Sequence, residues 1–360
     1  MPAQLDILAL EPFYGGVRRV MLETVIRCSR HRWTLLKLPP RRIERRLTAA
    51  AHWFSEQLSR HWVGRVDLLF TSEAMNLADL FRLVPRLSKL PSVVYFHSNQ
   101  LPTVDEPKQT PHDLVNLNTA TACNEIWFNS LFHLKTFLAR ASAMVQRHPE
   151  LATRNPMRDL TAKAHVIYPP IDLGVLHELQ NDKSIKREPR LIFVETRDAD
   201  VALLNAALVE LDRRGEEYRL VTVGPVEHLR PDVQRSTISE YDEAGQVRAI
   251  LSAGLLASTR NNATCDHHSI RALAGGCWPV VPMDGVYPEL LPEPLHPRCL
   301  HDRTIEQFAT RLQDMWYLDD DEIDTHRQDV KNALKHFDAY AACKAIDERF
   351  EQMVSNRATK

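Results

Sequence analysis

Two adjacent glycines stand where a predicted strand passes into a predicted helix near the start of the chain. Residues 11–16 read Glu-Pro-Phe-Tyr-Gly-Gly and directly follow the apolar run 5–10. Glycine lets backbone N–H groups approach a ligand closely, and a helix N-terminus favours an anion or a sugar hydroxyl. Gly15 and Gly16 could therefore cradle a ligand, or they could form only a tight turn. The sequence has no Gly-x-Gly-x-x-Gly pattern, which counts against a dinucleotide-dependent dehydrogenase.

Three polar residues, His97, Asn99 and Gln100, follow the predicted strand 92–96. In a parallel sheet the carboxyl ends of the strands border the ligand crevice, so these side chains are candidates for binding. The pKa of an unperturbed histidine, about 6.5, suits proton transfer at neutral pH. His97 could bind a substrate hydroxyl or act as an acid or base, and a structural role is equally compatible with the sequence.

A second polar group follows the predicted strand 125–128 and repeats this arrangement. Its members are Asn129, Ser130 and His133. They could line the same crevice. Asn129 or Ser130 could instead cap the helix that follows, because both side chains accept hydrogen bonds from the free backbone N–H groups of a first helical turn.

In the second half of the chain, two arginines and a glutamate stand at comparable positions. Arg260 follows a predicted strand, Arg271 lies in the helix after it, and Glu289 lies in the loop after the next strand. A guanidinium group can bind a diphosphate through two hydrogen bonds, so the two arginines could hold a nucleotide.

Metal binding and disulfide bonds are not expected. His267 and His268 are adjacent, but neighbouring residues of a helix point about 100° apart and no third ligand is apparent. The six cysteines are scattered without a Cys-x-x-Cys pair, which is typical of free thiols in a reducing cytoplasm. No apolar run approaches the roughly 20 residues of a membrane helix, and no secretory signal is visible. We therefore expect a cytoplasmic protein.

The first 65 residues are strongly basic, although the whole chain has a net charge of −2. They contain twelve Lys or Arg and five Asp or Glu, a net charge of +7. The densest part holds Arg41, Arg42, Arg45 and Arg46. This basic segment could neutralise the phosphates of a nucleic acid, or it could be a solvated helix face balanced by acidic residues elsewhere.

Short apolar strands alternate with longer helical patterns, which is typical of parallel α/β sheets. The predicted strands are 5–10, 33–38, 66–70, 92–96, 125–128, 191–194, 219–223, 255–258 and 278–281. The predicted helices between them are 20–27, 43–58, 78–87, 114–123, 201–213, 246–252 and 268–274. We predict two doubly wound domains, over 1–172 and 173–323, and a helical region over 324–360 that could pack back on the first domain.

Several motifs in one order resemble the tRNA-queuosine α-mannosyltransferases, which are related to the vertebrate glycosyltransferase-like domain-containing proteins. The resemblance is nearly continuous over residues 5–173 and is carried by 11–16, 33–36, 95–101 and 127–133. In the second half it is weaker and rests on 258–259, 276–279 and 287–292.

The resemblance implies a GT-B fold, in which two Rossmann-like domains face each other across a cleft. It also implies a nucleotide-sugar donor, with GDP-mannose favoured, and queuosine of a tRNA as the acceptor. Transfer would retain the anomeric configuration and would need neither a metal ion nor another cofactor.

The sequence departs from the family pattern in both halves. Two glutamates expected at the donor are replaced by Ala263 and Arg271, and a basic pair expected after the first strand of the second domain is reduced to Arg197. A Ser-His pair expected after the second glycine is Val17-Arg18, and a glutamate expected after the crevice histidine is Ser98. A catalytically impaired protein that binds RNA or sugar, or an enzyme with another small or lipid-linked acceptor, is therefore an alternative to the transferase.

The resemblance and the motifs together divide the candidate site residues into groups. His97 is the expected catalytic residue. The expected donor-binding residues are Gly15, Gly16, Arg197, Arg260, Arg271 and Glu289. The expected acceptor-binding residues are Glu11, Asn99, Gln100, Asn129, Ser130 and His133. The expected RNA-binding residues are Arg41, Arg42, Arg45 and Arg46.

Overall fold

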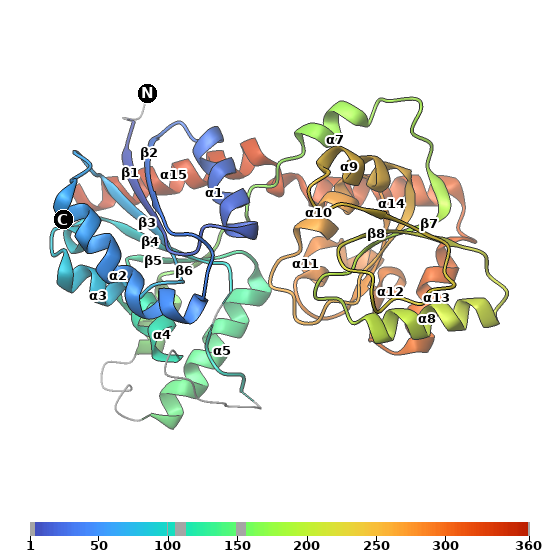
Figure 1. Cartoon of the computed structure of the whole chain (residues 1–360), viewed down its shortest axis with the longest axis horizontal. Helices are drawn as coiled ribbons and strands as arrows, with labels where there is room; N and C mark the ends of the chain where they lie inside the picture. The colour runs from blue at the N-terminus through green and yellow to red at the C-terminus, as the bar shows by residue number, and fades with distance from the viewer. Residues whose placement is uncertain (1–3, 99, 105–112, 149–155, 359–360) are drawn as a thin grey trace. The chain divides into compact units, whose positions relative to one another are not determined.

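The computed structural model describes residues 4–98, 100–104, 113–148 and 156–358. Asn99, one of the predicted site residues, lies outside these ranges. The chain divides into two compact units (Figure 1). Unit 1 comprises residues 1–170 and 339–360, and unit 2 comprises residues 171–338.

Unit 1 contains a parallel sheet with the strand order β2-β1-β3-β4-β5-β6. Its strands are β1 (Asp6–Glu11), β2 (Arg32–Lys37), β3 (Leu68–Ser72), β4 (Ser92–Phe96), β5 (Glu125–Phe128) and β6 (Ala164–Val166). The strand order reverses between β1 and β3, and in open α/β sheets ligands bind outside the carboxyl ends of the strands at such a point. Glu11 and the residues after Ser72 therefore border the expected crevice of unit 1.

Helices cover both faces of this sheet (Figure 1). They are α1 (Gly16–Cys28), α2 (Ile43–Arg60), α3 (Leu77–Leu83), α4 (Asp113–Ala122), α5 (Leu131–Arg147), α6 (Pro156–Ala162) and α15 (Ala339–Ala358). Alternate residues of β1 enter two different apolar cores, because successive side chains of a strand point to opposite faces. Ile7 and Ala9 pack with α1 and α15, whereas Leu8 and Leu10 pack with α2 to α6.

Unit 2 contains a second parallel sheet, with the strand order β12-β11-β10-β7-β8-β9. Its strands are β7 (Glu188–Glu195), β8 (Arg219–Val223), β9 (Arg235–Ile238), β10 (Ala253–Ala257), β11 (Trp278–Pro282) and β12 (Leu300–His301). Read from β9, this is the classical Rossmann order, and its reversal lies between β7 and β10. The carboxyl ends of β7 and β10 therefore border the expected crevice of unit 2.

The helices of unit 2 lie before β7, between the strands and after β12. They are α7 (Gly174–Leu179), α8 (Val201–Arg213), α9 (Glu243–Ser252), α10 (His267–Ala274), α11 (Tyr287–Leu290), α12 (His296–Cys299), α13 (Ile305–Met315) and α14 (Asp320–Ala333). The predicted α/β architecture with two doubly wound units is confirmed.

The last part of the chain consists of two helices that belong to different units. Helix α14 packs on α10 within unit 2, and α15 packs on α1 within unit 1. A 3-10 turn over Lys335–Phe337 separates them. In unit 1, Asp347 of α15 accepts hydrogen bonds from Ser29 Oγ at 2.6 Å and from the backbone N–H of Arg30 at 2.9 Å. The stacked rings of Trp127 and Phe350, 5.1 Å apart, extend this contact into the core.

Candidate functional site

Two buried glutamates stand at the strand reversal of unit 1. Glu11 ends β1 and Glu73 follows β3, and both are almost fully buried. Glu11 Oε1 accepts hydrogen bonds from the backbone N–H of Phe13 at 2.8 Å and from Ser72 Oγ at 2.9 Å. Burial raises the pKa of Glu11 to about 7, because the charged carboxylate is poorly solvated there. The predicted residue Glu11 thus lies at the expected edge and titrates near neutral pH.

Glu73 was not predicted from the sequence, yet it connects three segments of unit 1. Its carboxylate accepts hydrogen bonds from the backbone N–H groups of His97, at 3.3 Å, and Ser98, at 3.1 Å. It also forms an ion pair with Arg18 of α1. An acidic residue directly after a buried strand is the same signal that singled out His97, and it could have identified Glu73.

The carbonyl oxygen of His97 is held from the opposite side by the second predicted polar group. Asn129 Nδ2 donates to that oxygen at 3.1 Å, and Asn129 Oδ1 lies 2.8 Å from His133 Nδ1. The ring of His97 lies against Tyr95, with centroids 4.8 Å apart. His133 is fully buried, and burial lowers its pKa to about 3, so the ring is neutral at pH 7. Ser130 caps α5 by accepting from the backbone N–H of His133 at 3.0 Å, the alternative left open by the sequence.

The paired glycines meet two backbone requirements at the start of α1. A Cβ atom on Gly15 would lie 2.5 Å from Cγ of Pro40, so only glycine fits without displacing that ring. Gly16 has a φ of +54° with open space beside it, a conformation that other residues adopt at a cost. In the segment that follows β4, the backbone N–H of Gln100 donates to Asn116 Oδ1 at 2.7 Å. The glycine turn follows β1 and the His97 segment follows β4. Because the sheet is parallel, both lie at the same edge of it.

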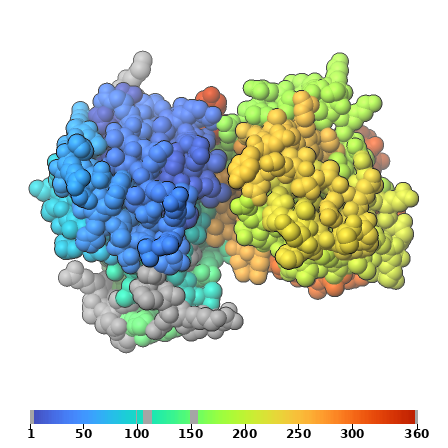
Figure 2. Space-filling model, in the orientation of Figure 1, coloured from blue at the N-terminus to red at the C-terminus, as the bar shows by residue number. Residues whose placement is uncertain are grey.

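The basic segment lies at the beginning of α2 and directly follows Pro40, the residue that packs against Gly15. Arg41, Arg42 and Arg45 are exposed, and half-buried Arg46 donates to the carbonyl of Pro39 at 3.1 Å. In the space-filling view, the blue atoms of the first part of the chain form much of the visible face of unit 1 (Figure 2). Cations in the first turn of a helix interact unfavourably with the positive end of the helix dipole. An anion bound there would be stabilised by the arginines and by the helix dipole.

At the strand reversal of unit 2, Glu195 ends β7 and Arg197 follows it. Glu195 is largely buried, and its Oε1 accepts from the backbone N–H of Arg197 at 2.8 Å. Burial raises the pKa of Glu195 to about 7. Gly224, after β8, has a φ of +100°, and a Cβ atom there would lie 2.9 Å from Thr196 Oγ1. The backbone segments that follow β7 and β8 therefore approach each other closely.

Arg260, which follows β10, is surrounded by carboxylates. Its guanidinium lies 3.4 Å from Asp266, 3.4 Å from Asp198 and 3.9 Å from Glu195. Asp266 is buried and caps α10, and it accepts a hydrogen bond from Tyr287 Oη at 2.8 Å. Arg260 is therefore fixed at the edge of the sheet, and an anionic ligand would have to compete with three acidic groups for it.

The other two predicted arginines of unit 2 also have acidic partners. Arg197 forms an ion pair with Glu240, and Arg271 Nη2 donates to Glu243 Oε1 at 2.8 Å. Glu289 lies half-buried in α11.

The loop before α10 and the first turn of that helix lie close to these arginines. The backbone carbonyl of Ala263 accepts from the N–H of Val286 at 2.8 Å. Burial lowers the pKa of His267 to about 4, and the pKa of neighbouring His268 is lowered for the same reason. Both rings are therefore neutral at pH 7 and add no positive charge to the site.

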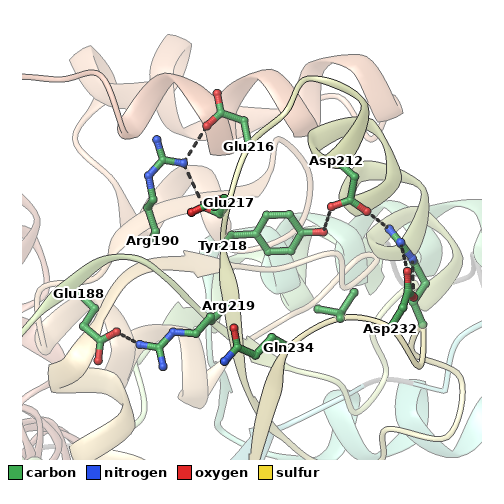
Figure 3. Close-up of a pocket in the computed structure, with 11 residues that line it drawn as sticks. Glu188, Arg190, Asp212, Glu216, Glu217, Tyr218, Arg219, Asp232 and Gln234 are labelled. Carbon is green, nitrogen blue, oxygen red and sulfur yellow. Dashed lines mark hydrogen bonds and ion pairs between the residues drawn. The ribbon is translucent and has the colours of Figure 1, made fainter.

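A cavity of about 460 Å³ lies at the opposite edge of the unit 2 sheet (Figure 3). It is lined by the beginnings of β7 and β8 and by residues before β9, and its walls carry ion pairs such as Arg190 with Glu216. Tyr218 Oη, which donates to Asp212 at 2.9 Å, closes one side. None of the predicted site residues lines this cavity.

The described residues contain no group of three or more His, Cys, Asp and Glu side chains that could hold a metal ion. None of their helices is long and apolar enough to cross a membrane.

Comparison with known proteins relates the chain to one family. Residues 6–171 match the family model described as tRNA-queuosine alpha-mannosyltransferase N-terminal. The tRNA-queuosine alpha-mannosyltransferase of Drosophila melanogaster is 25% identical over 318 residues, which cover 81% of this chain and 83% of the fly protein. The family resemblance predicted from the motifs is confirmed.

Solved structures share the fold over nearly the whole chain. The catalytic domain of starch synthase IV from Arabidopsis thaliana, bound to ADP and acarbose, has a TM-score of 0.68 at 10% identity and covers 98% of this chain and 100% of its own. HepE of Anabaena, in complex with UDP, has a TM-score of 0.64 at 14% identity, with coverages of 97% and 100%. The predicted GT-B fold is confirmed.

Proposed function

Because residues 6–171 match the family model described as tRNA-queuosine alpha-mannosyltransferase N-terminal, we propose that the protein transfers a mannosyl group from a nucleotide sugar to queuosine in tRNA. The observation that carries this proposal is the family match over residues 6–171, the segment that holds the polar groups at the carboxyl edge of unit 1. GDP-mannose is the proposed donor. In the reaction, the bond between C1 of mannose and the diphosphate breaks, and C1 bonds to a hydroxyl oxygen of queuosine, which loses its proton.

In unit 1, His97 is the proposed contact with the transferred sugar or the acceptor. Its backbone is held at the N–H by Glu73 and at the carbonyl by Asn129. A group held on both sides keeps its orientation, and correct orientation of reacting groups lowers the barrier of a transfer reaction. We propose that Glu11, Asn99, Gln100 and the polar residues after β5 form the acceptor side around it.

In unit 2, we propose that the edge formed by β7, β10 and α10 receives the diphosphate. The leaving diphosphate gains negative charge as the sugar departs, and a guanidinium placed beside it stabilises that charge. Arg260 and Arg197 flank Glu195, and Arg271 lies on α10, so each could turn from its carboxylate partner to the diphosphate. Glu289 is the proposed contact with the sugar or ribose.

The basic segment of α2 is the proposed contact with the tRNA backbone. Its exposed arginines could replace counterions along the phosphates, so that binding would weaken as salt concentration rises. This surface supplies affinity, whereas the carboxyl edge of unit 1 supplies the reacting groups.

The carboxylate partners of Arg197, Arg260 and Arg271 favour a second candidate function. A protein whose donor-side arginines stay in ion pairs would bind tRNA without transferring a sugar. The two functions differ in whether a product is formed.

The test incubates the protein with tRNA that contains queuosine and with GDP-mannose, UDP-glucose or ADP-glucose in separate reactions. Mass spectrometry of the digested tRNA then detects the addition of one hexose to queuosine. Queuosine-free tRNA is the control. A hexose added only with GDP-mannose and only to queuosine supports the proposal; tRNA binding without product supports the second function, and a product on another acceptor refutes the tRNA assignment.

A further inference from the structure

The two departures from the family pattern in unit 1 lie next to each other in space. Arg18 stands where the resemblance predicts a histidine, and Ser98 stands where it predicts a glutamate. Arg18 Nη2 donates to Ser98 Oγ at 3.3 Å, although the residues are 80 positions apart. Both also contact the carboxylate of Glu73, which follows β3. The departures therefore form one cluster rather than two independent changes.

Both carboxylate oxygens of Glu73 accept hydrogen bonds within this cluster. Its Oε1 accepts from the backbone N–H and the hydroxyl of Ser98, each at 3.1 Å, and its Oε2 accepts from the backbone N–H of His97 at 3.3 Å. The side chain of Glu73 is 1% exposed and that of Arg18 is 12% exposed. A buried carboxylate is stable only when it is paired and hydrogen-bonded, and Arg18 with the residues after β4 meets both conditions.

We propose that Glu73, which follows β3, supplies the carboxylate that the family pattern places after the crevice histidine. Together with Arg18, it acts as a positioning unit for His97. Glu73 accepts from the backbone N–H of His97 while Asn129 donates to its carbonyl oxygen, so the main chain is held on both sides of the His97 Cα atom. The ring of His97 extends from this fixed backbone and packs against Tyr95, with centroids 4.8 Å apart. The effect of this positioning on sugar transfer rests on the proposed function. The positioning of His97 by Glu73 is independent of the proposed function.

The test compares Glu73→Gln and Glu73→Ser with a transplant variant, Glu73→Ser combined with Ser98→Glu. The transplant returns the carboxylate to the position that the family pattern predicts, within reach of Arg18. Glu217→Gln, at an exposed site of unit 2, is the matched control. Thermal melting identifies variants that remain folded.

The first measurement is hydrogen–deuterium exchange of the His97 and Ser98 amides without substrate. Glu73→Gln and Glu73→Ser are expected to speed this exchange by about tenfold, because the acceptor of both amides is weakened or lost. The control variant is expected to leave it unchanged. Wild-type exchange in both Glu73 variants would overturn the proposal.

The second measurement is kcat/KM for mannosyl transfer. Glu73→Ser is expected to lower it by about 10²-fold, the effect of misplacing a reacting group by about 1 Å. The transplant is expected to restore it to within about tenfold of the wild type, which a role in stability alone would not predict. A transplant no better than Glu73→Ser would overturn the proposal. If the wild-type protein transfers no mannose, the proposed function fails, and the exchange measurement alone decides on Glu73.

Discussion

The affinity for the donor is expected to fall as the pH rises through 7, because of Glu195. This carboxyl group lies 3.9 Å from the guanidinium of Arg260, and burial raises its pKa to about 7. Below that pH Glu195 is mainly protonated, so it neither repels a diphosphate nor competes for Arg260. Above that pH the charged carboxylate repels the diphosphate and competes with it for Arg260.

The magnitude follows from linkage. If the diphosphate binds only to the protonated form, the apparent Kd is inversely proportional to the protonated fraction of Glu195, and it rises about tenfold between pH 6 and pH 8. This change corresponds to about 1.4 kcal/mol of binding free energy. A pKa of about 4 keeps His267 neutral over this range, so it does not contribute to the dependence.

Isothermal titration calorimetry with GDP-mannose at pH 6, 7 and 8 measures this effect, since the diphosphate of that ligand does not titrate near pH 7. Glu195→Gln keeps an oxygen that can accept from the backbone N–H of Arg197 but carries no charge. We expect its Kd to stay constant and close to the wild-type value at pH 6. The same pH dependence in Glu195→Gln as in the wild type would refute the reasoning.

Three further predictions concern unit 1. The pKa of Glu11, raised from 4.5 to about 7, means that ionising Glu11 costs the folded state about 3 kcal/mol above pH 7. The free energy of unfolding, measured with denaturant, should therefore fall as the pH rises from 5 to 7, and Glu11→Gln should flatten this fall. Gly16→Ala should lower the free energy of unfolding by about 1 kcal/mol, because alanine is strained at a φ of +54°; an unchanged Tm would contradict this. Replacing Arg41, Arg42 and Arg45 with serine should reduce the slope of log affinity for tRNA against log salt by about 2 to 3, as measured by filter binding, and an unchanged slope would remove the basic segment from the RNA contact.

The sequence was most informative about the central strands. The residues of β4, β5 and β8 are those predicted, because each strand is a short, mostly apolar run with clear boundaries. Three edge strands, β6, β9 and β12, were not predicted. They are two to four residues long and mostly half-exposed, so they show neither a continuous apolar run nor a regular alternation.

The site was predictable only where its residues follow a strand directly. Glu11, His97 and Asn129 were found in this way, and they lie at one edge of the sheet of unit 1. Glu73 also follows a strand directly, β3, and the same rule could have identified it, but its contacts with Arg18, His97 and Ser98 depend on the folded unit 1. The same holds for Asp266, whose contacts with Arg260 and Tyr287 depend on the folded unit 2.

The position of α15 has a consequence for the order in which the protein is assembled. Phe350 and its neighbours in α15 fill a core of unit 1, but they follow the whole of unit 2 in the chain. During translation, the ribosome therefore completes unit 2 before it delivers the helix that covers Trp127 and the adjacent face of the first sheet. Nascent unit 1 must keep that apolar face exposed in the meantime, and this makes it a natural client for chaperones until synthesis reaches α15.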